Sequence, residues 1–273
     1  MSKTIFITGS TDGIGKMTAE QLAQKGHELI IHGRNDQKVQ ATVESIKTTS
    51  GNEKIHGIVG DLSEFSTIQN LISDIKSRFS KIDILINNAG VFKSINPTNH
   101  TGQELRFMVN YLAPYALTYG LMPLLKNGEH TRIINLSSAA QAPVSLKALE
   151  GKSHLSQQET YAQSKLALTM WSFYLAQQEP ELNIIAVNPG SLLNTNMVRE
   201  AYGNFWSPAR KGADILYQLS LSTEVNGASG QYFDNDLGNF NRAHGDAYAS
   251  EKIRLLIDST QKIIKEYIPS LSY

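Results

Sequence analysis

Short runs of apolar residues recur along the chain, separated by longer segments with a helical pattern. They read TIFIT at 4–8, ELIIH at 28–32, DILIN at 83–87, RIINL at 132–136 and NIIAV at 183–187. Apolar residues follow one another within each run instead of alternating with polar ones, which is typical of strands buried on both faces. The pattern therefore predicts a parallel sheet with helices on either side.

The intervening segments complete an alternating order of strands and helices. Strands are expected at 4–8, 28–32, 54–60, 82–87, 132–137 and 183–188, with a short late one in GQYF at 230–233. Helices are expected at 14–25, 36–49, 63–79, about 102–126, and 157–178. Ser63 is the expected capping residue of the third helix, and Pro114 and Pro123 indicate a kink or an early end in the fourth. We predict one α/β domain over residues 1–273.

Composition narrows the class of protein. The chain has 25 basic and 25 acidic residues, so neither nucleic acid nor an anionic membrane is an expected partner. It has no cysteine, which excludes disulfides, thiolate catalysis and zinc sites built on cysteine. No apolar run approaches the roughly 18 residues that a membrane span needs, and the first residues lack a signal-peptide pattern. We expect a cytoplasmic protein. The seven histidines have no metal-like spacing, and DNDLG at 234–238 fails the pattern of a calcium loop, so no metal site is expected.

The first strand runs into TGSTDGIG, a glycine-rich turn that opens a helix. Glycines at such a turn let the backbone approach a pyrophosphate, and the helix N-terminus offers unpaired N–H groups. The spacing is G-x-x-x-G-x-G, and a turn without a ligand is the alternative. The expected cofactor-binding residues of this turn are Gly9, Ser10, Thr11, Asp12, Gly13, Ile14 and Gly15.

The end of the second strand should face the adenosine ribose of a dinucleotide. It is followed by Arg34 and Asn35, and a guanidinium there can bind a 2′-phosphate, which favours NADP(H) over NAD(H). The alternative for Arg34 is a solvated surface charge. Asp36 lies past the strand, where it more plausibly begins the next helix.

Three further strand ends carry candidate cofactor contacts. Asp61 could meet the adenine, with capping of a helix as the alternative, and NNAG could be either a cofactor wall or an ordinary turn. The turn NPGSLLNT ends in a threonine that could contact a carboxamide. The candidates are Asp61, Leu62, Asn88, Ala89, Gly90, Pro189, Gly190 and Thr195.

Tyr161 and Lys165 lie four positions apart in a predicted helix, so their side chains share one face. An unperturbed tyrosine has a pKa near 10, and a neighbouring ammonium should lower that pKa, which would let Tyr161 exchange a proton with a substrate oxygen. Ser138 at a strand end could stabilise the same oxygen, and Asn110 is an amide inside a helix. A chance surface pair and a turn serine are the alternatives.

The motifs TGSTDGIG, NNAG, Asn110, Ser138, YAQSK and NPG stand in the order found in classical short-chain dehydrogenases/reductases, which the chain resembles over nearly its whole length. The resemblance implies a Rossmann-type doubly wound sheet and a catalytic tetrad of Asn110, Ser138, Tyr161 and Lys165. It further implies that Lys165 also binds the nicotinamide ribose and that Asn110 supports a water-mediated proton path.

Finer similarity points to retinol-dehydrogenase-like members of that family. It rests on HGRN, on SPARKGADILYQLS at 207–220, on SGQYF and on the interval of 23 positions between Ser138 and Tyr161. This subgroup implies NADP(H)-dependent interconversion of a small carbonyl and its alcohol, with apolar substrates. The irregular stretches 139–156 and 191–208 follow strands, where open α/β sheets form their ligand crevice, so they are the expected substrate loops. The family resemblance also implies a homodimer or homotetramer through helices 102–126 and 157–178. A catalytically silent NADP(H)-binding regulator and an epimerase or dehydratase are the alternatives.

Overall fold

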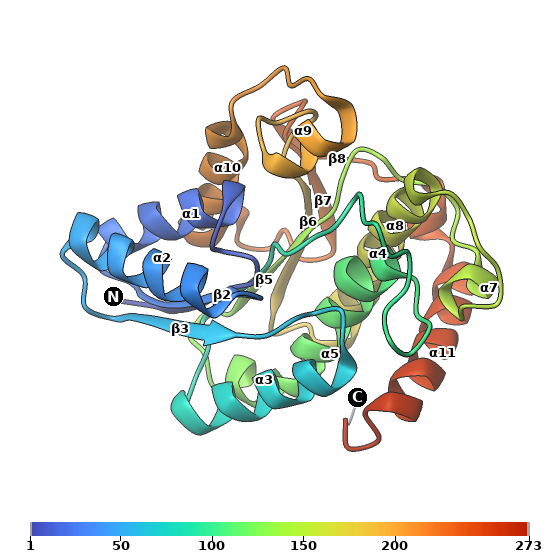
Figure 1. Ribbon diagram of the computed structural model, residues 1–273, viewed down its shortest axis with the longest axis horizontal. Coiled ribbons are helices and arrows are strands. Elements are labelled where there is room, and N and C mark those ends of the chain that lie inside the picture. The colour runs from blue at the N-terminus through green and yellow to red at the C-terminus, as the bar shows by residue number, and fades with distance from the viewer. Residues whose placement is uncertain (1, 272–273) are drawn as a thin grey trace.

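The computed structural model describes residues 2–271 and contains one eight-stranded sheet with the order β3-β2-β1-β4-β5-β6-β7-β8 (Figure 1). All neighbouring strands pair in parallel except β8, which pairs with β7 in antiparallel orientation. The strands are β1 (Thr4–Ile7), β2 (Glu28–Gly33), β3 (Ile55–Val59), β4 (Ile84–Asn87), β5 (Arg132–Leu136), β6 (Asn183–Asn188), β7 (Gln231–Asp234) and β8 (Asn239–Asn241). The doubly wound parallel sheet expected from the apolar runs is confirmed.

The two faces of the sheet build two separate apolar cores. Successive side chains of a strand point to opposite faces, so Ile5 and Ile7 enter one core and Phe6 the other. The Ile5 side is covered by α1 (Gly13–Gln24), α2 (Asp36–Ser50) and α10 (Ala209–Leu221). The Phe6 side is covered by α3 (Phe65–Arg78), α5 (Ala113–Gly120), α8 (Gln157–Gln178) and α11 (Ser250–Tyr267). Figure 1 shows both layers.

The predicted helix over 102–126 is wrong in detail, because four shorter turns replace it. These are α4 (Leu105–Phe107), the π-helical turn η1 (Met108–Leu112), α5 and α6 (Met122–Lys126). Pro114 and Pro123 each lie in the first turn of the next helical segment. The expected interruption is found before Pro123, where Leu121 leaves the helical conformation, whereas at Pro114 the backbone passes from η1 into α5 without a break. The π turn carries Asn110.

The predicted start of the third helix is also wrong. Helix α3 begins at Phe65, and its N-cap is Glu64 with no side-chain capping bond, so Ser63 does not cap it. Elements without a sequence prediction are α7 (Leu146–Leu149), α9 (Asn196–Tyr202), α10, α11, β8, and the 3-10 turns η2 (Thr223–Val225) and η3 (Gly245–Tyr248). The short α7 and α9 lie within the two predicted substrate loops.

Helix α11 covers the helices that were predicted to form subunit contacts. Its Leu256 and Ile264 share a core cluster with Trp171 of α8. The Tyr111 hydroxyl of η1 lies 2.8 Å from Thr260 Oγ1, and the Tyr267 ring stacks on Phe65 of α3 at 4.7 Å. The C-terminal helix thus packs on parts of η1, α3 and α8. Within residues 2–271 the structure has no helix with the length and apolar character to span a membrane.

Candidate active site

The glycine turn after β1 and the NNAG turn after β4 form one packed unit. The Asn88 side-chain amide donates to the carbonyls of Thr8 and Gly9, at 2.8 and 2.9 Å. A Cβ on Gly15 would lie 2.4 Å from Asn88 Nδ2, so no other residue fits at that position. Gly9 has a φ of 63°, which also favours glycine. Asn88 therefore shapes the turn through its own hydrogen bonds.

Ser10, a predicted cofactor contact, has its side chain beneath the turn. It is fully buried, its hydroxyl donates to the Ile7 carbonyl at 2.8 Å, and the same oxygen accepts from the His32 N–H at 2.9 Å. The Ser10 hydroxyl is therefore used inside the protein, so a cofactor contact of Ser10 would have to come from its backbone. Ile14 likewise points toward α10, because a Cβ on Gly212 would meet its Cδ1 at 2.9 Å.

His32 holds the glycine turn in place, a role that sequence reasoning missed. Its Nδ1 accepts from the Gly9 N–H at 3.1 Å, which leaves the proton on Nε2, and Nε2 donates to the Gly60 carbonyl at 3.0 Å. Burial lowers the pKa of His32 to about 4, so the ring is neutral at pH 7. The available signal was a polar residue at the end of a buried strand.

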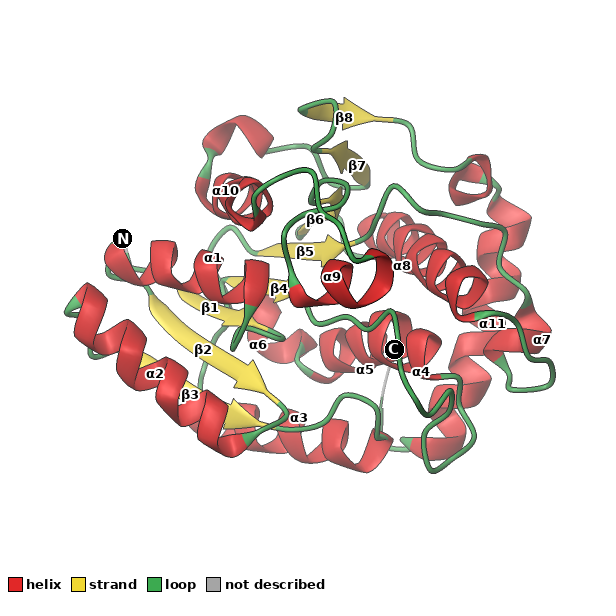
Figure 2. Cartoon of the chain, turned by 45° about the horizontal axis from the view of Figure 1, so that its top comes forward, coloured by secondary structure: helices red, strands yellow, loops and turns green. Residues whose placement is uncertain are grey.

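Thr11, Asp12 and Gly13 complete the turn. Thr11 lies against Gly33, where a Cβ would meet its Cγ2 at 2.7 Å. The Asp12 carboxylate accepts from the Gly13 N–H at 2.7 Å and from Asn196 Nδ2 at 2.5 Å. A Cβ on Gly13 would lie 3.8 Å from the Thr195 methyl group. The 191–208 segment therefore contacts the start of α1, and Figure 2 shows α9 between α1 and α8.

The predicted adenosine end contains Arg34, Asn35, Asp61 and Leu62. Arg34 is exposed, and within residues 2–271 it makes no hydrogen bond or ion pair. Asn35 is the N-cap of α2, with Oδ1 accepting from the Lys38 N–H at 2.9 Å. Asp61 Oδ1 accepts from the Ser63 N–H at 2.9 Å, while Leu62 is buried. Asp61 thus stabilises the turn before α3 and is not the N-cap of that helix, which is Glu64, while its adenine contact stays a prediction.

Tyr161 and Lys165 lie together in α8. Lys165 Nζ is 5.6 Å from the centre of the Tyr161 ring and donates to the Leu136 carbonyl at 2.7 Å. The lysine side chain is buried, and this desolvation lowers its pKa to about 8. The ammonium therefore remains largely charged at pH 7 in a place where few other groups can screen it.

Asn110 and Gly90 adjoin this pair. A Cβ on Gly90 would lie 3.3 Å from Asn110 Oδ1 and 3.6 Å from Lys165 Nζ. Asn110 Oδ1 accepts from the Val91 N–H at 2.8 Å, and its Nδ2 donates to the Val91 carbonyl and to Ser164 Oγ, each at 3.0 Å. The Asn110 side chain thus joins the loop after β4 to α8, and both N–H groups of its amide are used.

The two adjacent serines after β5 differ in direction. Ser137 is buried, and its hydroxyl lies 2.7 Å from Thr169 Oγ1 and 3.1 Å from the Lys165 carbonyl, inside the packing of α8. Ser138 is partly exposed, and its Oγ accepts from the Ala140 N–H at 3.1 Å. Of the two hydroxyls, that of Ser138 is therefore the more accessible, and its contact with a substrate stays a prediction.

The NPG turn after β6 is held by the DNDLG segment. Asp236 accepts from the Ser191 N–H at 2.8 Å, from the Ser191 hydroxyl at 2.5 Å and from Asn188 Nδ2 at 2.9 Å. Asn235 Nδ2 donates to the Pro189 carbonyl at 2.8 Å, and Gly190 has a φ of 121°. DNDLG is thus a clamp on a predicted cofactor turn, a use that its sequence did not indicate.

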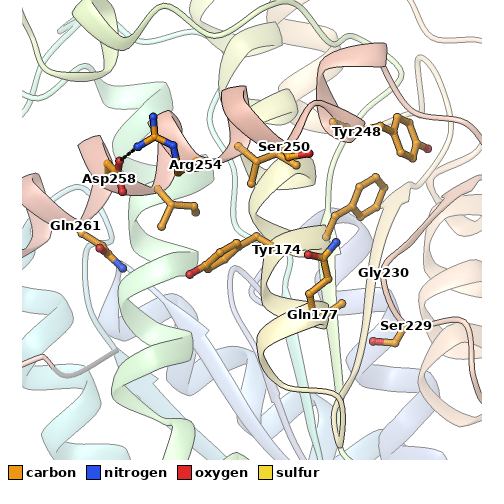
Figure 3. Close-up of a pocket in the computed structure, with 14 residues that line it drawn as sticks. Tyr174, Gln177, Ser229, Gly230, Tyr248, Ser250, Arg254, Asp258 and Gln261 are labelled. Atoms are coloured by element: carbon orange, nitrogen blue, oxygen red, sulfur yellow. Dashed lines mark hydrogen bonds and ion pairs between the residues drawn. The ribbon is translucent and has the colours of Figure 1, made fainter.

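Two other features lie outside this arrangement. The described part of the chain holds no cluster of three or more histidine, cysteine or acidic side chains that could bind a metal. A cavity of about 670 Å³ opens between α8 and α11, lined among others by Tyr174, Gln177, Tyr248 and Arg254 (Figure 3). None of the predicted site residues lines it, so we assign it no part in the chemistry.

The residues at the carboxyl edge suit a dinucleotide. Glycine turns, the N-terminus of α1, a free guanidinium and a buried ammonium converge where doubly wound sheets bind such ligands. Fold and site together define a Rossmann-type dinucleotide-binding protein.

Comparison with known proteins identifies the family. Residues 3–204 match the family described as short chain dehydrogenase. Human polyprenol dehydrogenase is 31% identical over 258 residues, covering 86% of this chain and 77% of that protein. Mouse retinol dehydrogenase 13 is 30% identical over 252 residues, covering 85% and 75%. The chain belongs to the short-chain dehydrogenase/reductase family and is an oxidoreductase of the kind that uses a nicotinamide cofactor.

Solved structures agree on the fold. Salutaridine reductase from Papaver somniferum has a TM-score of 0.68 at 24% identity, covering 85% of this chain and 99% of that chain. The RhlG/NADP active-site complex of Pseudomonas aeruginosa has a TM-score of 0.69 at 22% identity, covering 85% and 94%. At these identities the likeness establishes the doubly wound architecture alone.

Proposed function

We propose that the protein is an NADP(H)-dependent oxidoreductase that interconverts a carbonyl and an alcohol, with Tyr161 as general acid and base. The observation that carries this proposal is the pairing of Tyr161 with a buried lysine 5.6 Å from its ring. A charged ammonium in a desolvated position strongly favours the phenolate form of a neighbouring tyrosine. That is what a group needs if it is to give up and regain a proton near pH 7.

Each residue of the tetrad has a separate task. The bound cofactor supplies or accepts the hydride. Tyr161 Oη donates a proton to the carbonyl oxygen during reduction and removes it from the hydroxyl during oxidation. Ser138 Oγ donates a hydrogen bond to the same oxygen as charge develops there. The Lys165 ammonium favours the phenolate form of Tyr161. Asn110 holds the loop after β4 against α8 through hydrogen bonds.

The choice of NADP(H) rests on Arg34. Its guanidinium is exposed at the carboxyl end of β2 and has no partner within residues 2–271, so it can bind a phosphate bidentately. Asn35 stays committed to the start of α2, which keeps the backbone beside Arg34 in place. NAD(H) has no 2′-phosphate, so with NAD(H) bound the Arg34 guanidinium would have no phosphate to pair with.

For the substrate we propose an apolar carbonyl or alcohol. Met197 of α9 reaches the wall at Gly90, since a Cβ there would lie 3.5 Å from its Cε, and the Phe92 ring packs against Tyr161. Retinol and polyprenol, which the names of the relatives give as substrates, are apolar alcohols. The substrate loops 139–156 and 191–208 would enclose such a molecule.

The catalytic assignment is tested with Tyr161→Phe. We expect turnover of a panel of apolar aldehydes, ketones and alcohols, followed by NADPH absorbance, to fall by at least about 100-fold, because the proton donor is lost. NADPH affinity should change less than about twofold, since the phenyl ring remains. Tyr174→Phe alters a tyrosine of the same helix away from the tetrad and should keep full turnover. Wild-type turnover in Tyr161→Phe would refute the assignment.

The cofactor preference is tested with Arg34→Ala. Loss of a charge-assisted contact to the 2′-phosphate should weaken NADPH binding by about 10- to 100-fold and leave NADH binding nearly unchanged. Arg254→Ala removes an exposed guanidinium from α11 and serves as the matched control. An unaltered ratio of the two affinities in Arg34→Ala would assign the preference elsewhere.

A further inference from the structure

A buried ion pair lies beside the Tyr161 end of α8. Glu104 is 8% exposed and Arg106 is fully buried, and the Glu104 Oε1 atom accepts from Arg106 Nη1. Burying two opposite charges removes the hydration of both ions, and such a pair commonly stabilises a protein no better than apolar residues would. Its presence therefore calls for a reason other than stability.

Glu104 connects this pair to α8. Its Oε2 accepts from the N–H groups of Arg106 and Phe107, at 2.8 and 3.2 Å, and so caps the start of α4. Its Oε1 also lies 3.3 Å from Thr160 Oγ1, whose single hydrogen is shared with the Ser156 carbonyl at 2.9 Å. Thr160 is the residue immediately before Tyr161, so the carboxylate holds the backbone from which the proposed catalytic tyrosine projects.

Arg106 connects the pair to the ring of Tyr161. Its Nε donates to the Phe92 carbonyl at 2.8 Å. The Phe92 ring lies 4.6 Å from the Tyr161 ring at an angle of 54°. The guanidinium thus fixes the backbone of a residue whose ring packs directly on the phenol. The planar guanidinium donates to the Glu104 carboxylate and to the Phe92 carbonyl at once, and a lysine ammonium would not donate to both in this geometry.

We propose that Glu104 and Arg106 are positioning residues for Tyr161, which set the angle of its hydroxyl for proton transfer. The pair holds the tyrosine from two sides: at its backbone through Thr160 and at its ring through Phe92. Because the pair is neutral as a whole, it does so without adding net charge beside the phenol. The proposal rests on the proposed function, in which Tyr161 transfers the proton.

The test replaces both charges together, with the variant Glu104→Gln/Arg106→Met, so that no unpaired ion stays buried. Turnover per NADPH-binding site should fall about 10- to 100-fold, as expected from a misplaced reacting group. The solvent deuterium isotope effect on kcat should rise above the wild-type value, because proton transfer becomes slower. NADPH affinity should stay within about twofold. Phe92→Leu keeps the ion pair, removes the ring contact and should raise the isotope effect in the same way.

The matched control is Arg132→Met, which removes a buried arginine at the opposite end of the sheet. Arg132 binds the carbonyls of Leu219 and Ser222, so this variant should lose stability and keep the wild-type isotope effect. If the double variant and Phe92→Leu both keep wild-type turnover per site, or show no rise in isotope effect, the positioning role is refuted. A crystal structure of the double variant with the Tyr161 ring unmoved would also refute it. Turnover retained by Tyr161→Phe refutes instead the proposed function, so the two failures are distinguishable.

Discussion

Two buried basic residues show how burial acts at the scale of single side chains. Desolvation lowers the pKa of both Lys165 and His32, to about 8 and about 4. Lys165 therefore keeps its charge at pH 7, where the ammonium can act on Tyr161. His32 loses its charge, which frees Nδ1 to accept the Gly9 N–H. The same physical effect thus gives one residue a chemical task and the other a task in holding the glycine turn.

The pKa of His32 predicts sensitivity to acid. The unfolded chain binds this proton near pH 6.5, while the folded protein resists it down to about pH 4, so stability falls as the pH drops through that window. Between pH 7 and pH 5 the loss from this residue is about 2 kcal/mol. Urea unfolding at both pH values measures it, and His32→Asn should show a correspondingly smaller difference. Equal pH dependence in the two proteins would show that His32 is not the group responsible.

At the scale of elements, the cofactor crevice depends on contacts between turns distant in sequence. Asn88 joins the turns after β1 and β4, His32 joins those after β1 and β3, and Asp236 joins those after β6 and β7. Each junction uses a polar side chain at a strand end and a backbone group of another loop. Together they shape the carboxyl edge of the sheet before any ligand arrives, which reduces the entropic cost of binding one.

The Asp236 clamp yields a prediction about cofactor affinity. Asp236→Ala removes three hydrogen bonds from Ser191 and Asn188, so the NPG turn should become mobile. We expect NADPH to bind about 10-fold more weakly in fluorescence titration, with kcat at saturating cofactor little changed. Asp214→Ala removes an exposed carboxylate that pairs with Arg210 and is the control. An unchanged Kd in Asp236→Ala would mean that the turn keeps its shape without the clamp.

At the scale of the whole molecule, α11 determines which surfaces remain for partners. It packs on α8, η1 and α3, and it carries exposed charged residues that include Glu251 and Arg254. It therefore occupies part of the surface of 102–126 and 157–178 through which a homodimer or homotetramer was predicted. We therefore expect a monomer with a mass of 30.1 kDa in light scattering.

The variant Ile264→Asp tests this expectation further. Ile264 is fully buried beneath α11, and a carboxylate there should detach the helix, expose the α8 face and cause self-association. Lys265→Asp changes the next, exposed residue and should leave the mass unaltered. A wild-type dimer whose mass Ile264→Asp does not change would place the subunit interface on another surface.

Much of the fold was predictable because its signal is local. Continuous apolar runs predicted β1, β2, β4, β5 and β6 to within two residues at each end, since two-sided burial excludes polar residues from such strands. Helix α8 was predicted over its full length. The breaks in 102–126 were expected at the prolines, whereas the π turn was not, because it depends on packing against α8.

The sequence by itself determined the alternating α/β order, the glycine turn and the helical spacing of Tyr161 and Lys165, because each follows from backbone preference or periodicity. Only the tertiary structure decided which polar groups bond to one another. Ser10 accepts from the His32 N–H, Asp236 accepts from Ser191 in the NPG turn, and Glu104 pairs with Arg106 beside Tyr161. Ser10 and His32 are 22 positions apart and Ser191 and Asp236 are 45 apart, whereas Glu104 and Arg106 are neighbours whose burial against Tyr161 arises only in the folded chain. A buried polar group pairs with whatever donor or acceptor the folded packing brings near, and local sequence carries no record of that choice.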